Sequence, residues 1–127
     1  MKKHLLIVGG AGYIGSYVNK ILQSEYTTTV LDNLSTGSKE NVLNSTLVVS
    51  DYGSKDSLEN IFSKNKIDAV LHFAALTNVG ESVEKPNLYY ENNVTKSLIL
   101  FDTMSRFGVD KLIYSSSAAI FRNPTQP

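Results

Sequence analysis

The chain has 127 residues and contains no cysteine. This excludes disulfide bridges, thiolate metal sites and a cysteine nucleophile. Long apolar runs are also missing, and none approaches the ~20 residues that a membrane-spanning helix needs. The apolar run at residues 5–8 is too short for the core of a signal peptide, so we expect a cytoplasmic protein with no membrane partner.

Neither sign of charge is in excess, because twelve basic side chains balance twelve acidic ones. We therefore expect no general attraction to nucleic acid or to an anionic membrane surface. Apolar residues make up 42% of the chain and charged residues 19%, which is typical of a globular protein. The length predicts one domain, residues 1–127.

Short apolar runs alternate with helical patterns along the chain. Near-continuous apolar runs are typical of parallel strands that are covered on both faces. The pattern predicts an α/β fold, a Rossmann-like doubly wound parallel sheet of about five strands in the order 3-2-1-4-5. The expected strands are residues 3–8, 28–31, 46–49, 69–73 and 111–115, and the expected helices are 13–23, 56–64 and 87–107.

The helix expected at residues 87–107 has the clearest periodicity. Its apolar residues recur at spacings of four and three, which predicts a stripe packed on the sheet, and Gly108 is expected to end it. The stripe consists of Val94, Leu98, Phe101 and Met104.

The last ten residues, 118–127, include two prolines and no apolar period. They offer no further helix or strand to cover the strand at 111–115. We therefore expect that strand to form an exposed edge of the sheet, in a domain that is incomplete on its C-terminal side.

The motif Gly9-x-x-Gly12-x-x-Gly15 directly follows the first apolar run and opens a helical stretch. A tight turn needs a residue that tolerates positive φ, and a diphosphate lying against the backbone leaves no room for a Cβ. The N–H groups at the start of the next helix would face those phosphates. The motif in this context predicts a dinucleotide site.

Asp32 ends the second apolar run, seventeen residues after Gly15. A carboxylate there can accept hydrogen bonds from ribose hydroxyls and repel the additional phosphate of NADP. Residues 33–37 contain no arginine to bind that phosphate, which favours NAD as the cofactor. Asp51 follows the third strand and either meets the adenine or is an ordinary turn residue.

Two further groups of polar residues allow alternative interpretations. His72 lies within an apolar strand without a partner carboxylate or metal-ligand spacing, so we assign it a structural role. Ser115, Ser116 and Ser117 follow the fifth strand, at the edge where open α/β sheets bind ligands. Their hydroxyl groups either serve an active site or satisfy backbone groups in a turn.

Taken together, these motifs resemble the extended short-chain dehydrogenase/reductase superfamily, and within it the UDP-glucose 4-epimerases. The stretches Gly-Glu-Ser-x-x-Lys-Pro at 80–86 and Tyr-Tyr-x-Asn-Asn-Val at 89–94 are the most specific to the sugar epimerases. The matching segments are residues 9–16, 32–37, 72–75, 79–86, 89–94 and 115–118.

The resemblance implies an NAD-dependent interconversion of UDP-glucose and UDP-galactose, as in galactose metabolism, with a UDP-sugar as substrate. In that family NAD removes hydride from C4 of the sugar, and a tyrosine of a Tyr-x-x-x-Lys motif takes the hydroxyl proton. By position, Ser117 would bond the same sugar oxygen. The family positions that line the NAD site correspond here to Gly9, Gly12, Tyr13, Ile14, Gly15, Asp32, Asn33, Asp51, Tyr52, Phe73, Ala74, Ala75 and Asn92.

The chain also departs from the family pattern. No Tyr-x-x-x-Lys motif occurs in the 127 residues, so we expect the chain alone to be catalytically inactive. Thr77 stands where many members have a lysine, Phe121 where tyrosine is frequent and Arg122 where glycine is common.

Several alternatives therefore stay open. The chain could be a fragment of another nucleotide-sugar epimerase or dehydratase, a non-catalytic NAD-binding module, or the product of a decayed gene. Family members form homodimers through helices that include the one matching 87–107. The second helix of that interface is missing from this sequence, which argues against a dimer of this chain.

Overall fold

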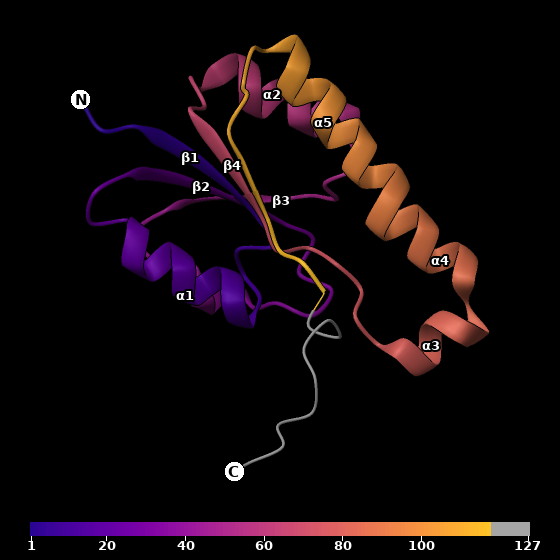
Figure 1. Ribbon diagram of the computed structural model, residues 1–127. Helices are drawn as coiled ribbons and strands as arrows, with labels where there is room; N and C mark the ends of the chain where they lie inside the picture. Colours follow the sequence, from indigo (N-terminus) through magenta and orange to yellow (C-terminus); the bar gives the residue numbers. More distant parts are fainter. Residues whose placement is uncertain (118–127) are drawn as a thin grey trace, which may run out of the picture.

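The computed structural model describes residues 1–117, which alternate between strands and helices (Figure 1). The predicted run 118–127, with its two prolines and with Phe121 and Arg122, lies outside the described residues. The strands are β1 (His4–Val8), β2 (Thr27–Asp32), β3 (Thr46–Val49), β4 (Ala69–His72) and β5 (Leu112–Tyr114). The α-helices are α1 (Tyr13–Leu22), α2 (Lys55–Lys64), α3 (Val79–Glu84), α4 (Pro86–Tyr90) and α5 (Lys96–Arg106), with a 3-10 turn, η1 (Lys39–Asn41), and a π-helical turn, η2 (Glu91–Thr95).

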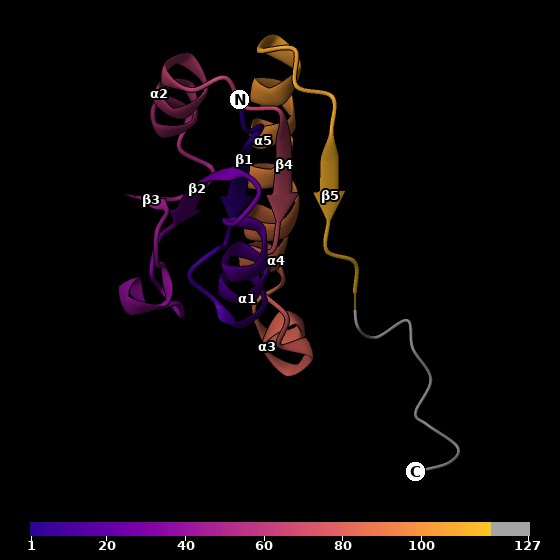
Figure 2. The ribbon, with the colours of Figure 1, turned by 90° about the vertical axis from the view of Figure 1, so that its left-hand side faces the viewer.

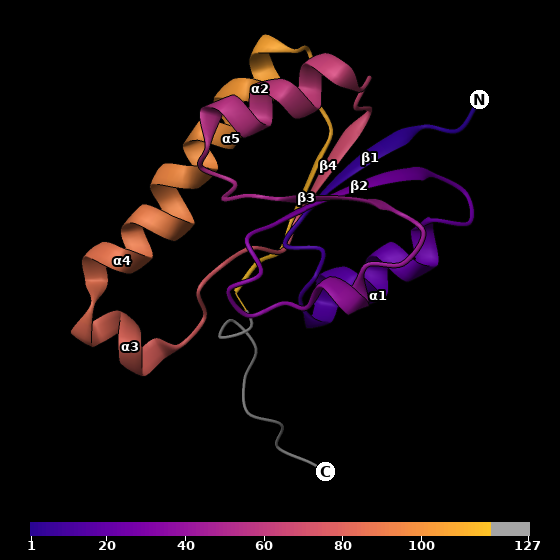
Figure 3. The ribbon, with the colours of Figure 1, turned by 180° about the vertical axis from the view of Figure 1, so that it is seen from behind.

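The five strands form one parallel sheet in the order β3-β2-β1-β4-β5, which confirms the predicted topology (Figure 2). β1 lies between β2 and β4, so that Leu6 is opposite both Thr29 and Val70. Helix α1 covers one face of the sheet, and α2 and α5 cover the other (Figures 1 and 3). The crossovers place the carboxyl ends of all five strands at one edge.

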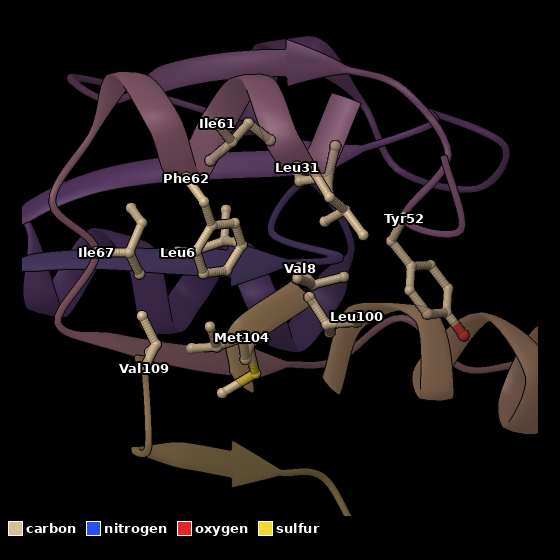
Figure 4. Packing of buried hydrophobic residues seen from close by; sticks show 12 residues of the cluster. Leu6, Val8, Leu31, Tyr52, Ile61, Phe62, Ile67, Leu100, Met104 and Val109 are labelled. Atoms are coloured by element: carbon tan, nitrogen blue, oxygen red, sulfur yellow. The ribbon is translucent and has the colours of Figure 1, made fainter. Parts of the chain in front are cut away.

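The main hydrophobic core lies between the sheet and the pair α2 and α5 (Figure 4). Alternate side chains of β1, Leu6 and Val8, point into it because successive strand residues face opposite sides of the sheet. Burying each such side chain contributes about 1.5–3 kcal/mol. The cluster consists of Leu6, Val8, Leu31, Tyr52, Leu58, Ile61, Phe62, Ile67, Val70, Leu100, Met104 and Val109.

The predicted stripe on the helix at 87–107 is wrong in part. Met104 is buried, but Leu98 is 60% exposed and Val94 is also exposed. The buried face of α5 instead includes Ser97 and Thr103, whose hydroxyls donate to the carbonyls of the preceding turn. These bonds let polar side chains pack against the sheet, so an apolar period could not identify the buried face.

The same region also contains an irregularity within the expected helix. The chain forms α4, the π-helical turn η2 and then α5, which Figure 3 shows as one nearly continuous rod. A π-turn adds a residue to one helical turn and rotates everything that follows. A pattern with a uniform period of 3.6 residues therefore does not hold across residues 91–95.

Gly108 ends α5, as predicted. Its φ is +69°, a conformation that glycine adopts without strain. The N–H of Val109 donates to the carbonyl of Met104 at 2.8 Å, and the N–H of Gly108 donates to that of Ser105 at 3.1 Å. These two bonds form a Schellman motif, and Val109 and Met104 meet in the core.

β5 is the edge strand beside β4, and its three residues are exposed. Among residues 1–117 no further strand pairs with its outer edge, which agrees with the predicted exposed edge (Figure 2). Ile113 pairs with Leu71, and Tyr114 pairs with His72. Within the same residues, no helix has both the length and the apolar character needed to cross a membrane.

Candidate functional site

The glycine motif forms the turn between β1 and α1. Gly9 has φ +77°, and a Cβ on it would lie 2.7 Å from the backbone nitrogen of Ala74. A Cβ on Gly15 would lie 2.8 Å from the Cα of Gly10. A Cβ on Gly12, in contrast, would come no closer than 3.5 Å to the rest of the chain, at the carbonyl oxygen of Gly9. The fold therefore requires glycine at positions 9 and 15, but not at position 12.

Gly12 is also the N-cap of α1, and no side chain caps this helix. The first turn of α1 contains no acidic residue. Its N–H groups and the positive end of the helix dipole therefore face the glycine turn without a side-chain acceptor, an arrangement that suits an anion such as a diphosphate.

A cleft of about 340 Å³ lies at the carboxyl ends of β1, β2 and β4, beside this turn. Most of the predicted cofactor residues line it, from five separate parts of the chain. These are Gly9, Gly12, Asp32, Asn33, Tyr52, Phe73, Ala74, Ala75 and Asn92. The sequence assigned no cofactor contact to the other wall residues, although several lie in the stretches that match the family. They are Leu31, Ser35, Thr36, Ser50, Leu76, Thr77, Asn78, Glu81 and Tyr89.

The remaining predicted residues lie outside the cleft wall. The side chains of Tyr13 and Ile14 are 94% and 54% exposed at the start of α1, and Gly15 is packed beneath the turn. Asp51 lies next to the wall residues Ser50 and Tyr52 but is not part of the wall itself. Ser117, the last described residue, is exposed and also lies outside the wall.

Asp32 is held firmly at the end of β2. Its Oδ2 accepts the N–H of Ala11 at 2.9 Å, and its Oδ1 accepts the N–H of Leu34 at 2.8 Å. Each carboxylate oxygen has a further lone pair for a ligand hydroxyl. The loop after β2 lies directly on the glycine turn, because a Cβ on Gly37 would be 2.7 Å from the carbonyl carbon of Ala11.

Asn93 holds the opposite wall of the cleft in place. From the π-helical turn, its Oδ1 accepts the N–H of Leu76 at 2.9 Å and its Nδ2 donates to the carbonyl of Leu76, also at 2.9 Å. The Nδ2 of Asn92 donates to the same Oδ1 at 2.9 Å. The sequence signal for this contact is a pair of asparagines inside an expected helix, where polar amides need partners.

His72 lies beneath the cleft and is 1% exposed. Its ring contacts Tyr52 edge-on and lies tilted against Tyr114, with centroids 4.9 Å and 4.7 Å away. Burial lowers the pKa of His72 to about 4, so the ring is neutral at pH 7. Burial also raises the pKa of Tyr52 to about 12, and its hydroxyl donates to the carbonyl of Asn92.

The carboxylate of Glu81 lies at the far end of the cleft. The hydroxyl of Tyr89 donates to Oε2 of Glu81 at 3.0 Å and accepts the N–H of Asn78 at 3.1 Å. These bonds tie α4 to the start of α3. Across residues 1–117 there is no group of three or more histidine, aspartate or glutamate side chains arranged to hold a metal ion.

The family model described as "NAD dependent epimerase/dehydratase family" matches residues 5–127. The chain belongs to this family. Among the relatives of this epimerase/dehydratase chain, the UDP-glucose 4-epimerase of Bacillus subtilis (strain 168) is 42% identical over 130 residues, which cover 94% of this chain and 38% of that protein. UDP-glucose 4-epimerase 2 of Arabidopsis thaliana is 40% identical over an alignment of 138 positions, gaps included. The alignment covers 99% of this chain and 39% of that protein.

Solved structures of this family agree with the fold. The UDP-glucose 4-epimerase from Brucella ovis, in complex with NAD, superposes with a TM-score of 0.89 at 40% identity. The match covers 98% of this chain and 38% of that one. The epimerase/dehydratase chain therefore spans about two fifths of the length of these relatives.

Proposed function

We propose that this chain forms the NAD-binding part of a nucleotide-sugar epimerase of the UDP-glucose 4-epimerase type. The observation that carries the proposal is Gly12, since its lack of a side chain has no explanation within the fold. A diphosphate against the uncapped start of α1 supplies that explanation, because a Cβ would stand between the phosphate and the backbone.

The proposed contacts follow the cleft from one end to the other. The diphosphate lies on Gly12 and the first turn of α1, and the adenosine ribose bonds to Asp32. The wall that Asn93 holds faces the nicotinamide half. When bound, NAD supplies a hydride acceptor, and the chain's own residues bind it, orient it and exclude water. The other proposed cofactor contacts are those of Gly9, Tyr13, Ile14, Gly15, Asn33, Asp51, Tyr52, Phe73, Ala74, Ala75 and Asn92.

The site favours NAD over NADP. Both oxygens of Asp32 are fixed by backbone N–H groups, so the carboxylate cannot swing away from a phosphate on the ribose. No arginine occurs in residues 33–37 to neutralise such a phosphate. The like-charge contact would therefore weaken NADP binding.

A UDP-sugar is the proposed substrate of the complete protein. One structural relative, the UDP-glucose 4-epimerase of Thermotoga maritima, was solved with UDP-glucose. In this chain we assign Ser117 to the sugar oxygen at the reacting carbon. The complete protein would then interconvert UDP-glucose and UDP-galactose in the cytoplasm, as part of galactose metabolism.

A second sugar is also compatible with the similarities. A putative UDP-arabinose 4-epimerase of Arabidopsis thaliana is 39% identical over 132 residues, close to the values for the glucose enzymes. The cofactor half is thus similar in enzymes named for different sugars. Turnover assays of a complete protein with both UDP-sugars would separate the two candidates.

The direct test is a calorimetric NAD titration of the 127-residue chain and its Gly12→Ala variant. We expect Gly12→Ala to weaken NAD binding at least tenfold, about 1.4 kcal/mol, while the free energy of unfolding falls by about 1 kcal/mol or less. Gly80→Ala is the matched control, because its added methyl group would come no closer than 3.4 Å to any neighbour. A folded wild-type chain that does not bind NAD would contradict the proposal.

A further inference from the structure

We propose that Lys96 is a positioning residue that makes the NAD site selective for adenine, acting through Asp51 and Asn33. This inference rests on the proposed function, since it concerns the end of the cleft that would hold the base. Lys96 is the first residue of α5 and belongs to neither the glycine motif nor the cleft wall.

The ion pair between Lys96 and Asp51 joins two distant parts of the chain. The Nζ of Lys96 lies 2.6 Å from Oδ2 of Asp51, across a sequence separation of 45 residues. The two side chains are only 22% and 37% exposed, so water screens them less than a surface pair.

The stem of Lys96 is also confined. It passes so close to Gly53 that a Cβ on this glycine would lie 3.1 Å from the Cδ of the lysine and nearer still to its Cγ. Any other residue at position 53 would displace the lysine. Because Gly53 has no side chain, the stem of Lys96 can pass over it, and the ammonium group reaches Asp51 from that side.

Asp51 in turn connects Lys96 to the cleft wall. Its Oδ1 accepts the N–H of Gly53 at 2.8 Å, and the side chain of Asn33 is near enough to the carboxylate to contribute to its lowered pKa. The Oδ1 of Asn33 is occupied by the N–H of Ser35 at 3.0 Å, which leaves Nδ2 as the group that can donate to Asp51. Partial burial would raise the pKa of Asp51, but these partners, led by Lys96, hold it below the usual range.

This network determines what the base end of the cleft can recognise. The oxygens of Asp51 and Asn33 that keep free lone pairs are acceptors, so they favour a base whose edge donates a hydrogen bond. The exocyclic amino group of adenine does so, whereas hypoxanthine presents a carbonyl oxygen in the same place. Lys96 holds Oδ2 and so keeps the carboxylate turned to this edge. Without the lysine, the bond from the Gly53 N–H holds Oδ1 and leaves Oδ2 without its charged partner.

The test compares the binding of NAD and of nicotinamide hypoxanthine dinucleotide to the 127-residue chain by calorimetry. We expect the wild-type chain to prefer NAD at least tenfold. Lys96→Met keeps the stem but removes the charge, and it should lower that preference at least threefold. Lys111→Met is the matched control, because Lys111 pairs with Asp110 near β5, far along the chain from the cleft residues.

A second variant separates positioning from a general loss of structure. Asp51→Asn should lower the preference by itself, and adding Lys96→Met to it should then change nothing further, because the lysine acts through the carboxylate. If the wild type binds NAD and Lys96→Met has the same preference for NAD, only the role of Lys96 is overturned. A wild-type chain that binds neither dinucleotide would overturn the proposed function as well.

Discussion

The three glycines of the motif, Gly9, Gly12 and Gly15, are required for different reasons. The packing of the chain requires the first and the third, and the proposed ligand requires the second. The first adopts positive φ against Ala74, and the third lies under the turn. Gly12 alone faces a space that the chain leaves open. The spacing in the sequence identified all three glycines. It could not show which of them the packing of the chain requires and which one the binding of a ligand requires. That distinction depends on Ala74, which follows β4 and lies against Gly9, and on the folded turn that lies against Gly15.

The buried His72 should make the protein sensitive to acid. Its pKa is about 4 in the folded protein, below the ordinary value of 6.5, and its ring neighbour Tyr52, with a pKa of about 12, stays neutral in this range. Between these values the unfolded chain binds the proton more readily. The stability is therefore complete above pH 6.5 and falls as the pH drops toward 4, by about 3 kcal/mol at most.

Urea unfolding at a series of pH values measures this effect. His72→Phe should remove most of the slope between pH 4 and pH 6.5, because the ring stays in the core without a titrating nitrogen. His4→Gln is the comparison, since His4 is the other histidine of the sequence, half-buried at the start of β1. Burial also lowers the pKa of His4, so this variant should remove only a smaller part of the slope. An unchanged slope in His72→Phe would show that another group controls the acid response.

At the scale of elements, the strands were predicted more accurately than the longest helix. The predicted strand positions agree with β1 to β5 to within a residue or so at each end, because continuous apolar runs define buried parallel strands directly. The region 87–107 was predicted as one amphipathic helix. The π-helical turn and the buried hydroxyls of Ser97 and Thr103 could not be predicted, since both depend on partners outside the local period.

Asn93 is the residue through which this irregular helix supports the cleft. Asn93→Leu would leave the N–H and carbonyl of Leu76 without their side-chain partners, and it should lower the free energy of unfolding by about 1–3 kcal/mol. The amide proton of Leu76 should exchange with solvent faster, because the loop can then open locally. Hydrogen exchange followed by NMR measures this directly.

Asn87→Leu is the control for that experiment, since Asn87 is an exposed residue of α4. It should leave the exchange of the Leu76 amide unchanged. Slow exchange of Leu76 in Asn93→Leu would mean that the loop 73–78 is held by its backbone alone.

At the scale of the whole molecule, the strand order and the location of the cleft followed from the alternation of elements and from the glycine motif. The contact between Lys96 and Asp51 did not, because the two residues are 45 positions apart and no local pattern links a lysine to one carboxylate among many. Asp51 was predicted to be either an adenine contact or a turn residue. The structure adds that it is paired with Lys96, and the contact with adenine stays a prediction.

The 127-residue chain should not interconvert UDP-glucose and UDP-galactose by itself. The reaction needs a base that takes a proton near neutral pH, and no Tyr-x-x-x-Lys motif occurs in the sequence. Tyr52 cannot replace it, because burial raises its pKa to about 12. An assay of UDP-galactose turnover with added NAD should give the rate of the protein-free control. Turnover that Ser117→Ala abolishes would contradict this expectation.

The central position of β1 has a consequence for the time course of synthesis. One neighbour, β2, follows soon after it, but the bond from the His4 N–H to Asp68, at the entrance to β4, spans 64 residues. At about 5–20 residues per second, a ribosome needs several seconds to deliver the other neighbour. During that interval this strand, with four of its five residues buried in the folded protein, has one edge open. The pace of translation between the first strand and the fourth therefore sets how long a nascent chain is exposed to mispairing.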